Sequence, residues 1–225
     1  GTIITVEGTG YKTGEIVQID FGTTRTITTT TPDAQGKFST TFTIDTQGYG
    51  IRTITAYGID SHATAKGTLT ILPEIILITP IQGSVGTIVT VVGNGFNTVS
   101  KVTIKFGNTP TITFVTSTIA GSFTTTFTVD TQINQVWNII VTDGMGISDM
   151  GTFNIIPAIH VSPTSGTVGK VVTLWGDGFD SHETMRVEFG TTLVGNGLCF
   201  NSNNGSFSTT FTITTQPFGT TTFRA

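Results

Sequence analysis

The chain has 225 residues and carries 10 Lys and Arg against 14 Asp and Glu, so its formal net charge is -4. This acidic balance excludes a protein dedicated to binding phosphate backbones, and we expect no nucleic-acid partner. Charged residues make up only 11% of the chain, whereas threonine occurs 51 times and glycine 28 times. Because β-branched residues favour strands over helices, this composition predicts an all-β protein.

Two further features limit the class of protein. No run of residues approaches the roughly 18 consecutive apolar residues of a membrane-spanning helix, so we expect no direct membrane insertion in this segment. The single cysteine, Cys199, cannot form an internal disulfide, so stability must come from packing. Without an adjacent base or cation, Cys199 is predicted to be a small, half-buried strand residue rather than a reactive thiol.

The sequence repeats itself, and the repeat decides the predicted architecture. A motif of two glycines around one residue, followed by an aromatic residue, occurs three times at spacings of 85 and 83 positions. Its copies are Gly8-Thr9-Gly10-Tyr11, Gly93-Asn94-Gly95-Phe96 and Gly176-Asp177-Gly178-Phe179. A Gly-x-Phe-x-Thr-Thr-Phe segment recurs in step with it. We therefore expect three modules, at residues 1–73, 74–157 and 158–225, joined by very short linkers that contain proline.

Each module carries about seven short apolar runs separated by turn signals, which is typical of a β-sandwich. The middle module shows these runs best. Its strands are expected at residues 75–78, 88–92, 101–106, 111–116, 122–129, 137–141 and 151–156.

One strand of each module alternates strictly between large apolar residues and threonine. In the middle module, Phe123 and Phe127 are predicted to face the core, because successive side chains of a strand point to opposite sides. Thr124 and Thr126 then face solvent, and the other modules fit the same register. The predicted core aromatics are Phe21, Phe38, Phe42, Phe106, Phe123, Phe127, Trp137, Trp175, Phe189, Phe207 and Phe211.

The paired glycines are interpreted as tight turns or bulges that use the freedom of glycine at positive φ. A nucleotide-binding loop would need to open a helix, whereas another expected strand follows each of these pairs. Gly36, Gly121 and Gly205 are expected to close hairpins, the last of them through an Asn-Gly turn.

Two stretches, residues 78–96 and 161–179, resemble the opening of IPT/TIG immunoglobulin-like domains. Both contain a Pro-x-x-Gly turn, a further glycine, a hydrophobic strand and a Gly-x-Gly-Phe turn. The later Gly-x-Phe-x-Thr-Thr-Phe strand resembles tandem repeats of prokaryotic cell-surface and S-layer proteins. The resemblance implies tandem immunoglobulin-like sandwiches in an extracellular protein of the cell surface. It offers no catalytic residue to carry over.

The residues that usually build catalytic or metal sites are few. No histidine has a cysteine or a second histidine at ligand spacing, which argues against a zinc or nucleophile-base site. Solvated loop positions are the preferred interpretation of the three histidines, His62, His160 and His182.

The best metal candidate is the acidic turn that contains Asp177, Asp180 and Glu183, because calcium needs several converging oxygen ligands. The first two modules lack this set of residues. An acidic turn exposed to solvent is therefore the preferred reading, and no other cofactor is expected.

These observations favour a structural, non-enzymatic segment of an extracellular surface layer or cell-surface repeat protein, whose partners are copies of itself in a lattice or filament. The alternatives are an adhesin or glycan-binding module and a spacer of an extracellular enzyme. A site for surface glycans would need exposed aromatics, for which Tyr11, Tyr49 and Phe218 are the loop candidates.

Strand propensity explains the abundance of threonine but not the shortage of charge. Flat strands with few charges invite edge-to-edge pairing, and bulky O-linked glycans would block it. The sequon Asn204-Gly205-Ser206 is a weaker N-glycan candidate, because its Asn-Gly pair is expected in a turn. The candidates for O-glycosylation are Thr26, Thr28, Thr41, Thr43, Thr124, Thr126, Thr128, Thr210 and Thr212.

Both ends of the sequence fall inside a module. Gly1 aligns with Gly86 and Ala225 aligns with Ala56, so we expect the first module to lack its first strand and the third its last. The preferred explanation is a longer repeat protein. The alternative is a strand from another molecule that completes each open edge.

Overall fold

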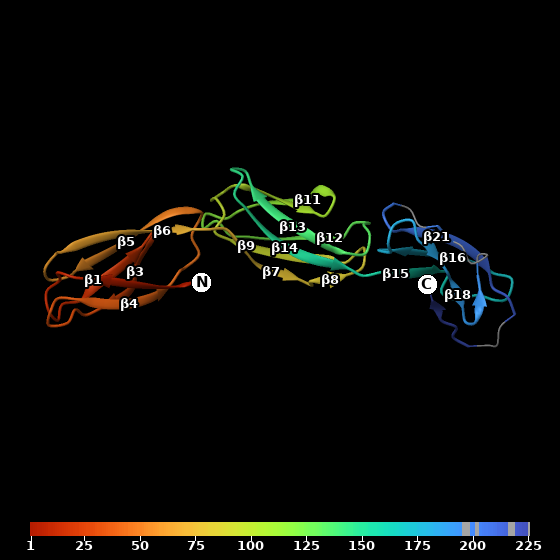
Figure 1. The fold of residues 1–225 in the computed structure, drawn as a ribbon, viewed down its shortest axis with the longest axis horizontal. Helices are drawn as coiled ribbons and strands as arrows, with labels where there is room; N and C mark the ends of the chain where they lie inside the picture. The colour runs from red at the N-terminus through yellow and green to blue at the C-terminus, as the bar shows by residue number, and fades with distance from the viewer. Residues whose placement is uncertain (195–198, 201–202, 216–218, 225) are drawn as a thin grey trace.

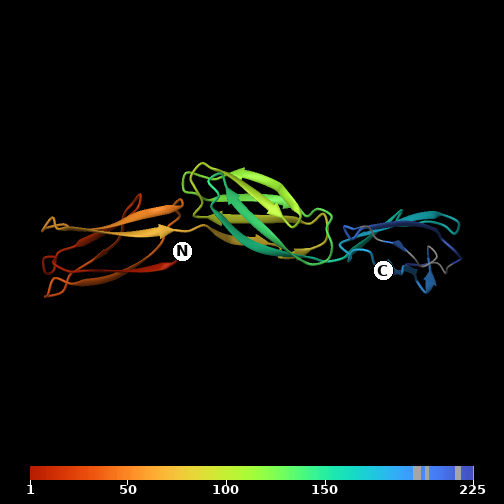
Figure 2. The same cartoon turned by 45° about the horizontal axis from the view of Figure 1, so that its top comes forward.

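The computed structural model describes residues 1–194, 199–200, 203–215 and 219–224. Within these ranges all regular elements are strands, and no helix could cross a membrane. Figure 1 shows three β-sheet modules in a row, the first in red and orange, the second in yellow and green and the third in cyan and blue. The row persists in the turned view of Figure 2. The expected all-β tandem sandwiches are therefore confirmed.

The middle module is a sandwich of a three-stranded sheet, β12-β9-β7, and a five-stranded sheet, β11-β10-β13-β14-β8. All seven expected strands are present, and β8 is an additional short strand that pairs parallel with β14. The chain therefore crosses from one sheet to the other between β7 and β8. The strands are β7 (Glu74–Thr79), β8 (Gln82–Gly83), β9 (Ile88–Asn94), β10 (Lys101–Phe106), β11 (Thr109–Thr116), β12 (Phe123–Thr128), β13 (Val136–Asp143) and β14 (Ser148–Ile155).

The first module repeats this arrangement with fewer strands, in sheets β1-β4 and β3-β2-β5-β6. β1 takes the place of β9. Among the described residues it pairs only with β4, whereas β9 lies between β12 and β7. The strands are β1 (Ile3–Gly8), β2 (Val17–Phe21), β3 (Thr24–Thr30), β4 (Phe38–Thr43), β5 (Gly50–Gly58) and β6 (Thr64–Ile71).

The third module has sheets β15-β16-β21, β19-β18-β22 and β17-β20. β22 pairs with β18 as β13 pairs with β10. In the described part of the chain, no strand lies beyond β22 in the place that β14 takes beside β13. The strands are β15 (Ala158–Ser162), β16 (Val171–Asp177), β17 (Thr184–Met185), β18 (Glu188–Phe189), β19 (Thr192–Leu193), β20 (Cys199–Phe200), β21 (Phe207–Thr212) and β22 (Phe223–Arg224).

Each module has a hydrophobic core of its own, rich in aromatic side chains. Phe123 and Phe127 of β12 are buried while Thr124 and Thr126 are exposed, and β4 and β21 show the same alternation. Burial of one phenylalanine contributes about 1.5–3 kcal/mol, so these rings are major stabilising elements. The predicted core aromatics that are buried are Phe21, Phe38, Phe42, Phe106, Phe123, Phe127, Phe207 and Phe211.

Three predicted core aromatics are placed differently. Trp137 and Phe189 are half-buried and pack against the margins of their cores. The prediction for Trp175 is wrong, because this side chain is 36% exposed. Alternation along β16 turns Val172 and Leu174 into the core, and Trp175 therefore faces outward.

The first glycine of each pair allows a phenylalanine ring to approach the backbone. A Cβ at Gly93 would lie 2.4 Å from Cε1 of Phe123, and one at Gly8 would lie 2.3 Å from Cε1 of Phe38. The second glycine has a positive φ, 72° at Gly95, which confirms the turn interpretation. Gly36, Gly121 and Gly205 also have positive φ angles. The expectation that they close hairpins is wrong, because each lies between strands of different sheets, β3 and β4, β11 and β12, and β20 and β21.

Candidate functional site

The two joints between modules are built in the same way. At the first joint, the backbone N–H of Tyr49 donates to the carbonyl oxygen of Phe96 at 3.0 Å. At the second, the N–H of Asn134 donates to the carbonyl oxygen of Phe179 at 3.4 Å. Phe96 and Phe179 close equivalent copies of the paired-glycine motif. At each joint, the paired-glycine motif of the following module therefore accepts the hydrogen bond from the preceding module.

The second glycine of the motif lets the preceding linker approach. A Cβ at Gly95 would lie 2.2 Å from the carbonyl oxygen of Leu72, and one at Gly178 would lie 3.1 Å from the carbonyl oxygen of Ile156. In the first module the equivalent Gly10 has no atom within 4 Å of that position. The motif thus serves both the core, through its first glycine, and the joint, through its second.

A buried glutamine fixes the turn that leads into each joint. In the first module, Nε2 of Gln47 donates to the carbonyl oxygen of Phe21 and to Oδ1 of Asp45, both at 2.9 Å. Asp45 also accepts a hydrogen bond from the hydroxyl of Thr24. Sequence reasoning missed this cluster, although an Asp-Thr-Gln triplet at 45–47 recurs at 130–132. The second copy consists of Gln132, Phe106, Asp130 and Thr109.

In the first module, Glu15 holds the loop between β5 and β6. Its carboxylate accepts the backbone N–H groups of Lys12, Asp60 and Ser61 at 2.8, 3.1 and 2.9 Å, and the Ser61 hydroxyl at 2.7 Å. Burial raises the pKa of Glu15, but the hydrogen bonds from Ser61, Lys12 and Asp60 outweigh it and hold the pKa below its ordinary value. Glu15 is therefore a structural carboxylate.

In the middle module, Asp143 at the end of β13 holds the loops that are equivalent to those held by Glu15 in the first module. Its Oδ2 accepts the backbone and side-chain N–H groups of Asn97, both at 2.9 Å, and its Oδ1 accepts the N–H groups of Met145 and Ile147 at 2.9 and 3.1 Å. Burial raises the pKa of Asp143, but these hydrogen bonds outweigh it and lower the pKa. The carboxylate thus comes from β13 here, whereas in the first module it comes from the loop before β2.

The three candidate calcium ligands are not brought together. Asp177 ends β16 and is half-buried, while Asp180 and Glu183 are exposed in the turn that follows. Across the described ranges, no three His, Cys, Asp or Glu side chains gather to hold a metal ion. Glu15 takes the place of Glu183 in the first module, where this position serves loop closure instead of metal binding.

His62 and His182 lie in exposed turns, as expected. His160 was expected in a loop but lies in β15, where its ring stacks on Trp175 with 5.4 Å between centroids and 22° between planes. Cys199 lies in strand β20, paired with Met185, as expected. The expectation about its side chain falls outside the described residues.

Of the three candidates for a glycan-binding loop, the structure describes Tyr11 and Tyr49, and neither side chain is exposed. The prediction for Tyr11 is wrong: this side chain is buried, and its hydroxyl donates to the carbonyl oxygen of Ala56 at 3.1 Å. Its position in the repeat, equivalent to Phe96 and Phe179, is the signal that could have placed it in the core. Tyr49 is half-buried at the first joint. Phe218 lies outside the described residues.

The outward threonines are placed largely as their strand register predicts. Among the O-glycan candidates Thr28 is half-buried. In the sequon at 204–206, Gly205 has a φ of 73°, so the Asn-Gly pair forms the expected turn. The exposed candidates are Thr26, Thr41, Thr43, Thr124, Thr126, Thr128, Thr210 and Thr212.

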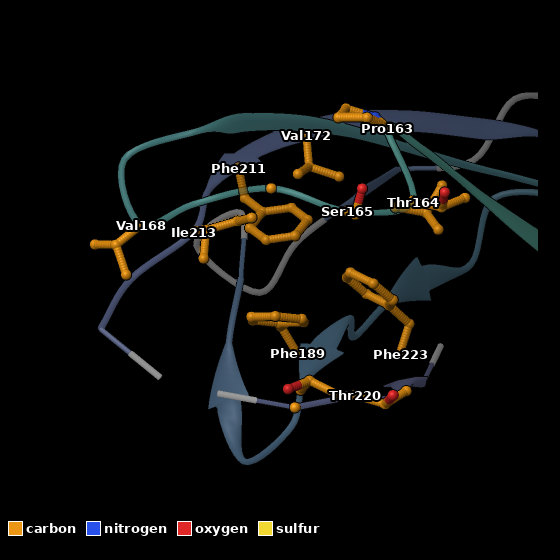
Figure 3. A pocket seen from close by; sticks show the side chains of 14 residues that line it. Pro163, Thr164, Ser165, Val168, Val172, Phe189, Phe211, Ile213, Thr220 and Phe223 are labelled. Carbon is orange, nitrogen blue, oxygen red and sulfur yellow. The ribbon is translucent and has the colours of Figure 1, made fainter. Parts of the chain in front are cut away.

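Two hollows lie in the terminal modules, where the middle module has an additional strand. The first has a volume of about 450 Å³ and lies at the first joint, where residues of the first module such as Ile4 and Leu69 line it together with the linker and with Ile76 and Asn94 of the middle module. The second, in the third module, has a volume of about 430 Å³. Figure 3 shows the rings of Phe189, Phe211 and Phe223 directed into it. Both hollows have a mixed lining, in which polar residues such as Asp45 in the first and Thr164 in the second lie beside the apolar side chains.

Comparison with known proteins agrees with this architecture. Residues 73–155 match the IPT/TIG domain family. No curated protein matches the chain in sequence. The match runs from the first linker to the end of β14, and the neighbouring modules repeat its strand arrangement.

Solved structures with some similarity include the bacterial integrin-binding protein invasin, which is 15% identical over 95% of this chain with a TM-score of 0.29. The protein SGBP-B of Bacteroides ovatus, solved with a mixed-linkage heptasaccharide, is 13% identical over 93% with a TM-score of 0.27. The BSP domain of a biofilm-associated protein is 11% identical over 98% with a TM-score of 0.28. The chain spans 51%, 54% and 59% of these three chains. The family match over residues 73–155 makes the middle module an IPT/TIG domain, set in a tandem array of immunoglobulin-like β-sandwiches.

Proposed function

We propose that this chain is a structural, non-enzymatic segment of an extracellular surface layer or cell-surface repeat protein, which assembles with copies of itself in a lattice or filament. The repeated joint carries this proposal. The same backbone contact, from Tyr49 to Phe96 and from Asn134 to Phe179, connects consecutive modules in a row. Because each additional module can form its joint through the same backbone contact, the array can be lengthened without a new type of interface. This property suits a spacer.

The outer faces of the sheets support a role in a crowded coat. Thr124, Thr126 and Thr128 form an exposed row on β12, and only 11% of the chain is charged. Hydroxyls both donate and accept hydrogen bonds, so such rows suit contacts between neighbouring molecules or the attachment of sugars. We therefore include O-linked glycans on exposed threonines in the proposal.

Electron microscopy of the purified protein over a range of concentrations tests the assembly. We expect sheets or filaments with a regular repeat. The double variant Thr124→Lys and Thr126→Lys adds like charges to the outer face of β12 without touching the core, and it should reduce assembly through that face. Particles that remain single at every concentration would reject the lattice.

Glycan binding is a second candidate, favoured by the outward-facing pair of Trp175 and His160. Trp175 is 36% exposed, and such an amphipathic ring offers an apolar surface to a sugar beside polar strand residues. A glycan array with the unmodified protein and with Trp175→Ala tests this function. Binding that disappears in the variant supports it, and an empty array with the unmodified protein rejects it.

A further inference from the structure

The middle module has only two cationic side chains, and both lie on the same face of one strand. Lys101 and Lys105 are its only lysines, and it has no arginine. Both are exposed on β10, where the alternate residues, such as Ile104, are buried in the core. Because residues on one face of a strand repeat every second position, the two lysines share the outer face of the five-stranded sheet, about 13 Å apart along the strand.

No carboxylate balances these charges on the same face. Glu74 begins β7 of the opposite sheet, and Asp143 is buried. The other two carboxylates are hydrogen-bonded within the module: Asp149 accepts a backbone N–H of β7 at 2.6 Å, and Asp130 accepts the side-chain amide of Gln132 at 2.7 Å. The structure describes the whole middle module, and among the described residues neither lysine forms an ion pair. The outer face of this sheet is therefore cationic, although the module has four carboxylates against two lysines.

The cationic face is a property of this module and not of the repeat. Lys105 precedes the Phe-Gly pair that recurs in every module, and Asp20 and Glu188 stand at the same place in the first and third. Lysines on edge strands commonly prevent edge-to-edge pairing, but β10 lies between β11 and β13. Protection of an edge therefore does not explain these two lysines, and a negatively charged ligand is the simplest explanation.

An exposed phenylalanine lies between the two lysines. Phe114 of β11 pairs with Thr103, the outward residue midway between them. Its ring is 62% exposed, and Nζ of Lys101 lies 4.6 Å from the ring centroid. The first module has Thr29 at the position of Phe114. The face thus presents a cation, an apolar ring and a second cation in a row.

We propose that this face binds a linear acidic polysaccharide, with its carboxylate or sulfate groups against Lys101 and Lys105 and the apolar side of a sugar ring on Phe114. A small anion cannot contact both lysines across about 13 Å, whereas a polymer with repeated acidic groups can. Lysines are depleted from the buried cores of protein interfaces, which argues against an acidic protein as the partner. Clusters of lysine are in contrast typical of sites for acidic polysaccharides. The inference goes beyond the structural role and rests only on the proposed location outside the cell.

Calorimetric titration of the purified chain with an oligogalacturonate and with a sulfated heparin fragment tests the proposal. At least one of them should bind saturably, and raising the salt from about 50 to 200 mM should weaken the binding, because ions screen exposed charges. The tighter ligand of the two identifies the acidic group. The methyl ester of the oligogalacturonate, which keeps the sugar chain but has no charge, should not bind. Absence of saturable binding to both acidic sugars, or equally tight binding of a polyglutamate peptide, overturns the proposal.

Removal of the two charges locates the site. The double variant Lys101→Gln and Lys105→Gln should bind the same ligand at least about tenfold more weakly, because it leaves no cation on the face. Lys37→Gln with Lys66→Gln is the matched control: these exposed lysines of the first module carry the same total charge, and affinity should change by less than about twofold. Equal losses in the two double variants would show that net charge alone attracts the ligand, and would contradict the proposed site.

Phe114→Thr separates contact with the ring from attraction by charge. The variant carries the residue of the first module at this position, and affinity should fall by about threefold to tenfold while its dependence on salt stays the same. Trp175→Ala should leave the affinity unchanged, since that ring lies in another module. Unchanged affinity of Phe114→Thr, or loss of binding in Trp175→Ala, would contradict the assignment. All titrations use single molecules in solution, so a failure of lattice assembly is distinguishable from a failure of this inference.

Discussion

Arg52 and Trp137 occupy equivalent positions in consecutive modules, and each donates a hydrogen bond to the turn that precedes the joint. Nη2 of Arg52 donates to the carbonyl oxygen of Gly48 at 2.7 Å, and Nε1 of Trp137 donates to the carbonyl oxygen of Ile133 at 3.0 Å. In both modules, the next residue of the turn is the one that donates to the following module. Two chemically different side chains therefore support the joint through the same hydrogen bond, because each presents an N–H group at similar reach.

Gly48→Val should loosen the first joint. A Cβ at Gly48 would lie 2.6 Å from Cγ2 of Thr98 in the next module, so the larger side chain must push the two modules apart. The separate cores should stay folded, and small-angle X-ray scattering should show a wider distribution of module orientations. Gly67→Ala, in open space, is the matched control. A scattering profile equal to that of the unmodified protein would show that this contact does not set the joint.

Phe127→Ala should destabilise the middle module by about 3–5 kcal/mol, because it leaves a cavity among the buried rings. Urea unfolding followed by the fluorescence of Trp137 measures this, in a Trp175→Phe background that leaves one of the two tryptophans. Thr126→Ala, on the exposed face of the same strand, should change stability by less than about 0.5 kcal/mol. A similar loss in both variants would refute the assigned register.

The alternation of apolar and polar residues along single strands made much of the fold predictable. Phe123 and Phe127 could be placed because threonines mark the opposite face of β12. The same signal was available for Trp175, because the alternation of β16 turns Val172 and Leu174 inward and therefore places Trp175 on the outer face. The strands of the middle module could be predicted for the same reason, since each is a short apolar run between turns.

The joints could not be predicted in this way, because they depend on contacts between residues far apart in the sequence. The hydrogen bond from Tyr49 to Phe96 joins two backbone groups. Such a bond requires no particular side chain, so the sequence does not reveal it. The acidic residues around Glu183 resembled metal ligands because a carboxylate can either coordinate calcium or accept hydrogen bonds from the N–H groups of a loop. Glu15 shows that this position of the repeat can serve the second purpose.

Asp143 should make the middle module sensitive to acid. Because folding lowers the pKa of this carboxyl, its ionised form stabilises the folded state, fully so above the ordinary pKa of 3.8. This contribution is lost as the pH falls from that value through the lower pKa of the folded state. Asp143→Asn should therefore lower the Tm at neutral pH and flatten the dependence of Tm on pH between about pH 5 and pH 2. An unchanged pH dependence would contradict the role of Asp143.

Residues 1–225, isolated as a fragment from the cells that make the protein, should be heavier than the 23.7 kDa of their polypeptide if exposed threonines carry O-linked glycans. Intact mass spectrometry measures the difference, and fragmentation with electron transfer locates the sugars. We expect them at exposed positions such as Thr126 and not at the half-buried Thr125 of the same strand. A measured mass equal to that of the bare polypeptide would contradict the prediction of O-linked glycans.

Electron cryotomography of cells that make the protein, with gold-labelled antibodies against the middle module, tests the structural role most directly. The account predicts labels outside the cell at regular spacings, in a layer or along filaments. Labels inside the cell, or scattered over the surface without any repeat, would contradict it.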